Sequence, residues 1–291
     1  MIKAEARAKI NLFLEVTARR PDGFHELATL FARMGLADRL TFRKAAPGIK
    51  LRVKNSPAGL KQEDNIVYKA AARFFGTFKV EPAVEMTLEK RVPVGAGLGG
   101  GSADAAAALK GLARLYRLPA SASGKLMKIA AGLGSDVPFF MLDSVLAEGR
   151  GRGEKLKPFA PGGRLPWLVL VYPGVPVYTK EVYGNLKLGT PADIARRLKD
   201  FAAFRRLLRT GRFNKDKAGL LFNRLEDPVL PRHKEVRLAR ERLAAWGADA
   251  VMMSGSGATV FGLCWSAARA RAVAAEARKV KSYTCILTKF C

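Results

Sequence analysis

The sequence of 291 residues predicts an α+β fold built from two domains. Three observations support this. Apolar and charged residues alternate with a period of two in residues 2–16, 49–54 and 84–89, which is the pattern of half-exposed strands. Apolar residues with helical spacing separate and follow these strands. Residues 149–163 are rich in glycine and proline, which favours a boundary there. We place the domain boundary between residues 157 and 158, which gives domains of residues 1–157 and 158–291.

The first domain combines strands with helices expected on one face of an antiparallel or mixed sheet. Its strands are the three alternating segments. Its helices are predicted at residues 65–78, 103–116 and 123–132, where apolar residues recur with helical spacing.

The second domain begins with a continuous apolar run, Trp167–Tyr172, which is typical of a buried strand. The pattern after it predicts a smaller sheet with helices packed on one side. Helices are expected at residues 192–210, 232–246 and 266–279, and strands at 248–253, 258–264 and 282–289.

The charge is strongly basic: 51 lysines and arginines against 25 acidic residues give a formal net charge of +26. Such a surface attracts polyanions, but a solvated basic surface explains the charge equally well. The three cysteines form no CxxC pair, which favours a reducing cytoplasm. Only two histidines are present, which argues against a histidine-rich metal site. No apolar run reaches the roughly 20 residues that span a bilayer. We therefore expect a cytoplasmic protein without a membrane partner.

A glycine-rich segment, residues 93–103, has five glycines between positions 95 and 101. Glycine allows backbone amides to approach an anion closely. Ser102 is expected to cap the following alanine-rich helix, with Asp104 in its first turn. Because a helix N-terminus favours negative charge, the segment predicts an anion site.

Two common phosphate-binding motifs do not fit this segment. No Gly-Lys-Ser/Thr closes it, so it is not a Walker A loop. Gly95-Ala-Gly97-Leu-Gly99-Gly100 matches GxGxxG, but the preceding strand alternates and no acid-tipped second strand follows at the expected spacing. A purely structural glycine loop stays open as an alternative.

The segment Pro93-Val-Gly-Ala-Gly-Leu-Gly-Gly-Gly-Ser102 resembles the phosphate-binding motif of the GHMP kinases, named for galactokinase, homoserine kinase, mevalonate kinase and phosphomevalonate kinase. Ala8-Lys9-Ile10-Asn11-Leu12 and Met253-Ser-Gly-Ser-Gly-Ala258 match two further motifs in order. The stretches AKINLFLEVTARRPDGFHELATLF, GSDVPFF and YPGVPVYTKEVY resemble the 4-diphosphocytidyl-2-C-methyl-D-erythritol kinases among them. The resemblance implies an N-terminal mixed α/β domain with the glycine-rich phosphate loop and a C-terminal ferredoxin-like domain.

The resemblance also implies a reaction, the ATP-dependent phosphorylation of the 2-hydroxyl of a CDP-linked polyol in the non-mevalonate route to isopentenyl diphosphate. Asp136 would be the catalytic base and Lys9 a catalytic cation, although its strand pattern alone suggests an outward lysine. Asn11 would bind the polyol. Phe24 and His25, which the Asp-Gly pair before them places after a tight turn, would hold the cytosine.

The remaining site residues follow from the same resemblance. Tyr183 would lie on the other side of the base, and Thr179 would contact polar groups of the substrate. Asn65 would lie near the adenine, although a helix N-cap explains it equally well. The ATP phosphates would bind residues 93–103: Pro93, Val94, Gly95, Ala96, Gly97, Leu98, Gly99, Gly100, Gly101, Ser102 and Ala103.

ATP implies Mg²⁺, for which Ser102 and Asp136 are the available oxygens; the sequence leaves its protein ligands open. The expected partners are then small molecules, and no nucleic acid is expected. The oligomeric state stays open between a monomer and a weak dimer. Two alternatives remain. One is another GHMP kinase of the homoserine or mevalonate type, against which the GFHELATLF segment argues. The other is a basic nucleic-acid-binding protein. The sequence contains no nucleic-acid-binding motif with interleaved aromatic residues, which argues against it.

Overall fold

The computed structural model describes residues 1–55 and 61–291. The chain forms two compact units, each assembled from several segments. Unit 1 comprises residues 1–8, 36–94 and 99–143, and unit 2 comprises residues 9–35, 95–98 and 144–291. No helix in the described ranges is long and apolar enough to cross a membrane.

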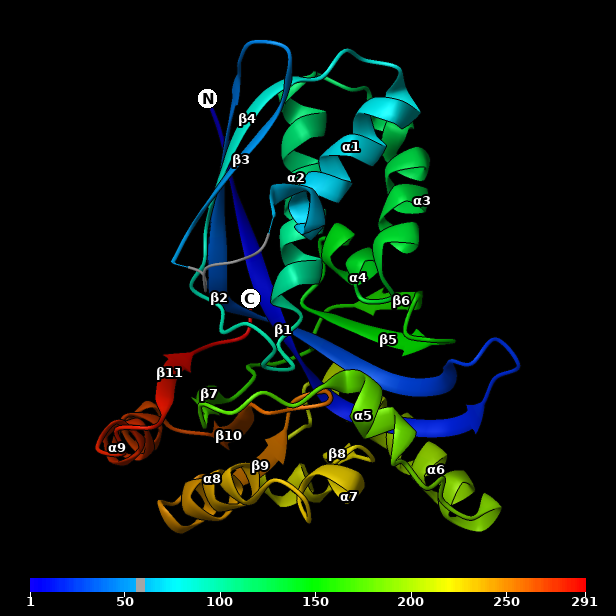
Figure 1. Ribbon diagram of the computed structural model, residues 1–291. Coiled ribbons are helices and arrows are strands. Elements are labelled where there is room, and N and C mark those ends of the chain that lie inside the picture. Colours follow the sequence, from blue (N-terminus) through cyan, green and yellow to red (C-terminus); the bar gives the residue numbers. More distant parts are fainter. Residues whose placement is uncertain (56–60) are drawn as a thin grey trace. The chain divides into compact units, whose positions relative to one another are not determined.

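Unit 1 consists of strands covered on one side by helices (Figure 1). β3 (Gly48–Lys54) runs parallel to β4 (Ala83–Glu89), which pairs antiparallel with residues 39–44 of β2 (His25–Lys44). On β4, Val84, Met86 and Leu88 are buried, as the alternation predicts. The helices are α1 (Ile66–Phe78), α2 (Gly100–Leu115), α3 (Ser123–Leu133) and α4 (Val137–Met141).

A helix lies close to the sheet of unit 1 at Gly111. A Cβ at this position of α2 would lie 2.4 Å from the ring of Phe42 on β2. Only glycine therefore lets α2, which is rich in alanine, lie this close to the strands.

Unit 2 contains a long hairpin formed by β1 (Ile2–Arg19), from Lys9 onward, and β2, up to Gly35. The turn at residues 20–24 joins these strands. β5 (Leu146–Arg150) pairs antiparallel with β2, and β6 (Lys155–Phe159) pairs with β5. A two-residue strand, β8 (Phe222–Asn223), runs parallel to β1 at Phe13 and Leu14.

Unit 2 also contains a ferredoxin-like sheet. β7 (Trp167–Tyr172), β9 (Ala250–Met253), β10 (Val260–Cys264) and β11 (Thr284–Thr288) lie in the order β11-β7-β10-β9, with every pair antiparallel. Helices α8 (Lys234–Ala245) and α9 (Ala267–Arg278) pack against it and complete the β-α-β-β-α-β order. The predicted ferredoxin-like domain and the α+β class are confirmed.

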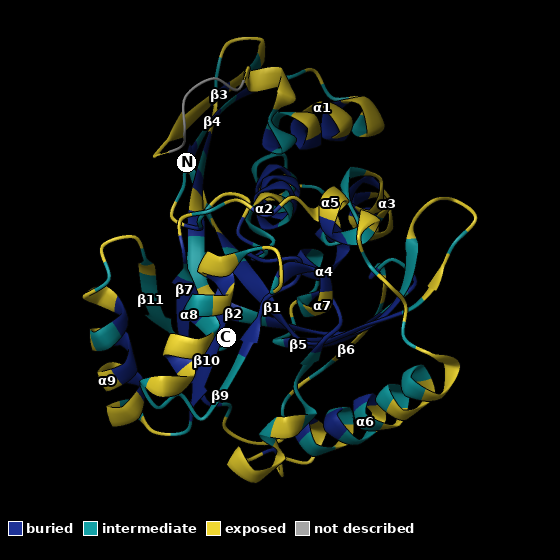
Figure 2. Cartoon of the chain, turned by 60° about the horizontal axis from the view of Figure 1, so that its bottom comes forward, coloured by how far each residue is buried: buried dark blue, intermediate teal, exposed yellow. Residues whose placement is uncertain are grey.

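Three further helices belong to unit 2: α5 (Thr179–Gly184), α6 (Pro191–Arg209) and α7 (Glu226–Val229). Figure 2 shows the basic helix α6 with exposed residues along one side and buried residues along the other. Phe201, Phe204 and Leu208 form the buried side. Short 3-10 helices span Gln62–Asp64, Ala120–Ala122 and Lys215–Leu220.

The predicted helices and strands of the second domain lie within three residues of the observed ones. The sequence analysis assigned no strand to β2. Residues 27–32 of this strand are all buried, so the alternation that marks a half-exposed strand is absent from them. The boundary predicted between residues 157 and 158 falls within β6 and stays a prediction.

Candidate active site

Lys9 begins a chain of buried hydrogen bonds along the hairpin of unit 2. Its Nζ donates to Asn11 Oδ1 at 2.8 Å, Asn11 Nδ2 donates to Thr29 Oγ1 at 2.8 Å, and Thr29 Oγ1 donates to the carbonyl of Phe13 at 2.7 Å. Lys9 is 5% exposed, so the outward-lysine interpretation is wrong. A buried ammonium is costly, and Asn11 is one of the groups that stabilise it.

Residues 95–98, the first half of the glycine-rich segment, lie next to this chain. The amide of Lys9 donates to the carbonyl of Leu98 at 3.0 Å, and the amide of Thr259 donates to the carbonyl of Ala96 at 3.2 Å. Gly95 and Gly97 both have positive φ. The segment is thus fixed on both sides by main-chain bonds.

A second glycine-rich element, which we call the glycine-rich turn (residues 254–257), packs on Gly97. Ser254 Oγ donates to the carbonyl of Gly97 at 3.0 Å, and a Cβ on Gly97 would lie 2.3 Å from the main-chain carbonyl oxygen of Ser254. A Cβ on Gly255 would lie 3.5 Å from Lys9 Nζ and 3.4 Å from Asn11 Oδ1. Unit 2 therefore brings together Lys9, Asn11, residues 95–98 and the glycine-rich turn.

The second half of the glycine-rich segment, residues 99–103, belongs to unit 1 and begins α2. The N-cap is Gly99, with φ of 67°, and the amide of Ala103 donates to its carbonyl at 2.9 Å. The prediction that Ser102 caps the helix is wrong, because Gly99 reverses the chain three residues earlier. The amides of Gly100, Gly101 and Ser102 then form the first turn, where helices attract anions.

Asp104 is buried away from that first turn, contrary to its predicted position. Lys90 Nζ donates to Asp104 Oδ2 at 2.7 Å and also to Asp38 Oδ2. Burial is the main reason that the pKa of Asp104 rises to about 8, and the neighbouring Asp38 raises it further. The two carboxyl groups keep the pKa of Lys90 above its usual value even though burial lowers it. This cluster, which no local sequence pattern predicts, fixes α2 to β2 and to the residues after β4.

Asp136 lies at the N-cap of α4, which has Pro138 in its first turn. The carbonyl of Asp136 accepts from Phe139 at 3.2 Å, while its side chain makes no capping bond to the helix. The side chain therefore does not act as the N-cap of α4. Asp136 as a residue is partly exposed.

The predicted cytosine-binding residues gather around the hairpin turn of unit 2. The ring of Tyr183 lies on that of His25, with centroids 4.9 Å apart and planes 30° apart. Phe24 is 50% exposed and packs against the guanidinium of Arg152, 4.6 Å from the ring centroid. Desolvation lowers the pKa of His25, and nearby Arg19 adds to this effect, so the imidazole is neutral at pH 7.

Thr179 connects this region to the glycine-rich turn. It begins α5, and its Oγ1 lies 2.8 Å from Ser256 Oγ. Neither Ser256 nor Arg152 is predicted individually from the sequence. An arginine between two glycines of a tight turn would have been the available signal for Arg152.

Asn65 fills the role that its local sequence predicts. It is the N-cap of α1, and its Oδ1 accepts from the amide of Val67 at 2.9 Å. Its side-chain amide group is not part of that bond. Asn65 and Asp136 both belong to unit 1, whereas Lys9 and the predicted cytosine-binding residues belong to unit 2.

Comparison with known families assigns both halves of the chain. Residues 65–144 match the GHMP kinases N terminal domain, and residues 192–282 match the GHMP kinases C terminal domain. The first match contains Asn65, the glycine-rich segment and Asp136.

Curated relatives extend the match to nearly the whole chain. A 4-diphosphocytidyl-2-C-methyl-D-erythritol kinase of Moorella thermoacetica is 40% identical over 287 residues, covering 97% of this chain and 96% of the relative. One of Pelotomaculum thermopropionicum is 42% identical, covering 100% of this chain and 98% of the relative.

Solved structures agree in fold. A crystal structure of 4-(cytidine 5'-diphospho)-2C-methyl-D-erythritol kinase superposes with a TM-score of 0.79 at 35% identity, covering 99% of both chains. A homoserine kinase from Cytophaga hutchinsonii reaches a TM-score of 0.77 at 17% identity, covering 99% of this chain and 94% of that one, which shows the shared fold alone. The chain belongs to the GHMP kinases and, within them, to the family of the 4-diphosphocytidyl-2-C-methyl-D-erythritol kinases.

Proposed function

We propose that the protein transfers the γ-phosphate of ATP to the 2-hydroxyl of 4-diphosphocytidyl-2-C-methyl-D-erythritol, giving the 2-phosphate and ADP. The observation that carries this proposal is the 40–42% identity, over nearly the full length, with relatives that bear that substrate's name. Fold similarity does not discriminate between acceptors, since a homoserine kinase superposes almost as well.

The phosphates of ATP bind the glycine-rich segment in this proposal. The amides at the start of α2 donate to phosphate oxygens, and the helix dipole favours their charge. Gly95 and Gly97 carry no side chain that would keep the ligand away. Asn65 contributes to binding the adenine through the amide group that its N-cap bond leaves available.

Asp136 accepts the proton of the acceptor hydroxyl as its oxygen attacks the γ-phosphorus and the bond to the β-phosphate breaks. Lys9 supplies positive charge to the acceptor oxygen and to the transferring group. The hydrogen bond to Asn11 holds the ammonium in place, and Thr29 in turn fixes the Asn11 amide. Asn11 keeps its orientation for the polyol because its partners are themselves buried.

The cytosine binds at the hairpin turn. His25 and Tyr183 are already in contact at 4.9 Å, which is less than the roughly 7 Å that a base between two stacked rings requires. The base therefore packs on the outer face of Tyr183 or on the exposed ring of Phe24. The neutral His25 offers one donor and one acceptor to the edge of the base.

Magnesium fits the site as an ion carried mainly by the nucleotide. The described ranges contain no group of three or more histidine, cysteine or acidic side chains that could hold a metal ion. Mg²⁺ retains phosphate and water ligands readily, so the Ser102 hydroxyl would be a sufficient protein oxygen, and the Asp136 carboxylate acts on the hydroxyl proton instead. When bound, the ion neutralises charge on the phosphates. A cytoplasmic location stays a prediction from the cysteine pattern.

Release of ADP from three acceptors tests the proposed function. With ATP and Mg²⁺, we expect turnover on 4-diphosphocytidyl-2-C-methyl-D-erythritol and none above background on homoserine or mevalonate. Turnover on homoserine or mevalonate alone would overturn the assignment. CMP should inhibit competitively against the acceptor, because it carries the cytidine group but lacks the 2-hydroxyl that is phosphorylated.

A further inference from the structure

Asn223 holds the glycine-rich turn through two hydrogen bonds from a single side-chain amide. Its Nδ2 donates to the carbonyls of Met253 and Gly255, both at 2.8 Å, and its Oδ1 accepts from the amide of Leu225 at 3.0 Å. Asn223 is 3% exposed. The amide therefore uses both of its donor hydrogens and its oxygen in the interior.

The turn held in this way contacts the proposed phosphate and acceptor sites. Gly255, whose carbonyl binds Asn223, is the residue that approaches Lys9 and Asn11. Ser254, next to it, donates to Gly97. A displacement of the turn would thus move Gly97 and change the surroundings of the Lys9 ammonium.

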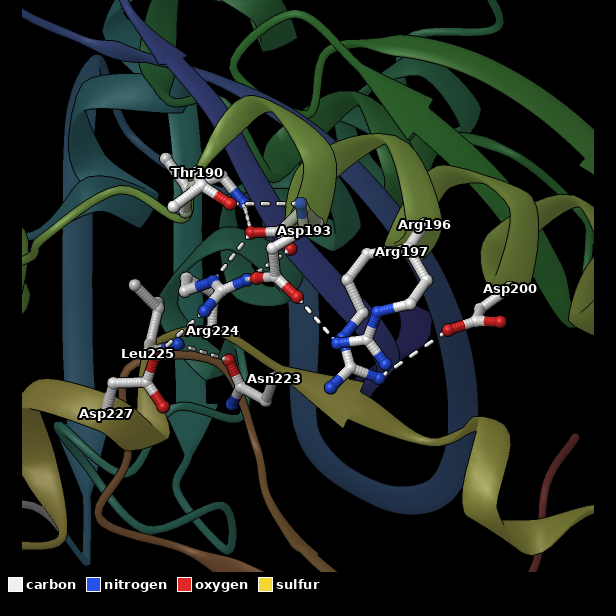
Figure 3. A network of polar contacts seen from close by, with 11 residues as sticks. Thr190, Asp193, Arg196, Arg197, Asp200, Asn223, Arg224, Leu225 and Asp227 are labelled. Carbon is white, nitrogen blue, oxygen red and sulfur yellow. Dashed lines mark hydrogen bonds and ion pairs between the residues drawn. The ribbon is translucent and has the colours of Figure 1, made fainter.

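The position of Asn223 is fixed by the strand that carries it. β8 pairs with β1 through only two residues, and the amide of Arg224 extends this pairing to the carbonyl of Leu14 at 2.8 Å. The Arg224 guanidinium binds both oxygens of Glu15 at 2.8 Å. It also binds Asp193 and Asp227 (Figure 3). Such a bidentate pair orients its partners strongly.

Figure 3 shows Asn223 and Arg224 side by side on the chain, each with its own polar partners. Glu226, two residues further on, accepts from the amide of Met253 at 2.7 Å. The short segment 223–226 therefore joins β1, α6 and the glycine-rich turn.

We propose that Asn223 is a positioning residue for phosphoryl transfer, which holds the glycine-rich turn against Gly97 and beside Lys9. This inference takes one thing from the proposed function, which is the identity of the alcohol that is phosphorylated. The contact with residues 95–98 makes ATP affinity the primary measurable property, and ATP affinity does not depend on which alcohol is phosphorylated.

The test compares Asn223→Asp with the wild type and with Asn214→Asp, a matched change at an exposed asparagine. In Asn223→Asp the side chain keeps its size, but an oxygen replaces the amide donor and faces two carbonyls. We expect the dissociation constant for ATP, measured by calorimetry, to rise roughly tenfold or more. The KM for ATP should rise in parallel, with the KM for the acceptor changed less, and Asn214→Asp should match the wild type.

Asn223→Ala is a second variant that introduces no buried charge. We expect faster hydrogen exchange at the amides of residues 254–257 than in the wild type, with unchanged protection in β7 and β10. Wild-type ATP affinity in either folded variant would overturn the proposal. So would loss of protection throughout β7 and β10 together with the turn, since that shows a role in the fold alone. Failure of the wild type to use the cytidine substrate, with these ATP effects intact, would contradict the proposed function and leave the role of Asn223 standing.

Discussion

A lysine side chain on a strand is stable in water and costly in a protein interior, and Lys9 lies in the interior with 5% exposure. Its ammonium is 2.8 Å from Asn11 Oδ1 and 5.4 Å from the centre of the Phe31 ring. Burial strengthens the electrostatic effect of a charge on nearby groups. At the scale of single residues, Lys9 and Asp136 therefore carry the chemical part of the proposal.

Asp136→Asn tests the proposed base. The variant keeps the size of the side chain but cannot accept the hydroxyl proton, so we expect kcat to fall by about a hundredfold or more. ATP affinity should change little, as calorimetry would measure. Asp143→Asn, at an exposed carboxylate of the same unit, is the matched control and should retain wild-type turnover. Near-normal kcat in Asp136→Asn would remove this residue from the proposed role.

Asp104 gives the stability of the protein a distinctive pH dependence. Its folded pKa of about 8 lies above the usual value of 3.8, so between pH 4 and pH 8 the folded protein holds a proton that the unfolded chain releases. Stability from this residue therefore falls as the pH rises through that window.

Asp104→Asn removes this titration. The difference in unfolding free energy between variant and wild type should shift in favour of the variant from pH 5 to pH 8, by at most about 1.4 kcal/mol per pH unit. Urea denaturation at several pH values measures it. Parallel pH profiles for the two proteins would contradict the raised pKa.

At the scale of elements, the glycine-rich segment and the glycine-rich turn act as one packed pair within unit 2. Gly97 requires glycine for two reasons: its φ is 73°, and a Cβ would lie 2.3 Å from the main-chain carbonyl oxygen of Ser254. Gly95 has a similar φ of 68° but nothing within 4 Å of its Cβ position. The two positions thus separate the cost of positive φ from the cost of lost packing.

Gly97→Ala should weaken ATP binding more than Gly95→Ala. Both variants bear the penalty of about 1 kcal/mol or more for positive φ in a non-glycine residue, but only Gly97→Ala must push the turn away from the segment. Calorimetric titration with ATP measures the difference. Equal losses in the two variants would show that packing between the two glycine-rich elements has no part in binding.

At the scale of the whole molecule, the features that a single sequence can predict are those that follow a local pattern. The strands of the ferredoxin-like sheet and the helices α8 and α9 follow local sequence patterns, which for β7 is a continuous apolar run, and they lie close to the predicted ranges. β2 has no assigned strand because its first half is buried on both faces. The burial of Lys9 is wrongly predicted for a different reason. Strand alternation places this lysine in solvent, and only tertiary packing shows that it is buried.

The least predictable parts are contacts between segments distant in the sequence. Asn11 to Thr29, Asn223 to Met253 and Lys90 to Asp38 each span 18 or more positions. No local periodicity encodes such pairs. The glycine content of the sequence located the glycine-rich segment, and the resemblance to a family located the glycine-rich turn. The structure added Thr29 as a support of Asn11 and Asn223 as a support of the turn.

The phosphorus NMR spectrum of the product tests the central claim most directly. The 2-carbon of the acceptor carries a methyl group and no hydrogen, so a phosphate on the 2-hydroxyl has no vicinal proton to couple with. With ATP and 4-diphosphocytidyl-2-C-methyl-D-erythritol, we expect a new phosphomonoester singlet in the proton-coupled spectrum, formed one for one with ADP. A phosphomonoester signal split by vicinal protons, or ADP formed without a phosphorylated acceptor, would contradict it.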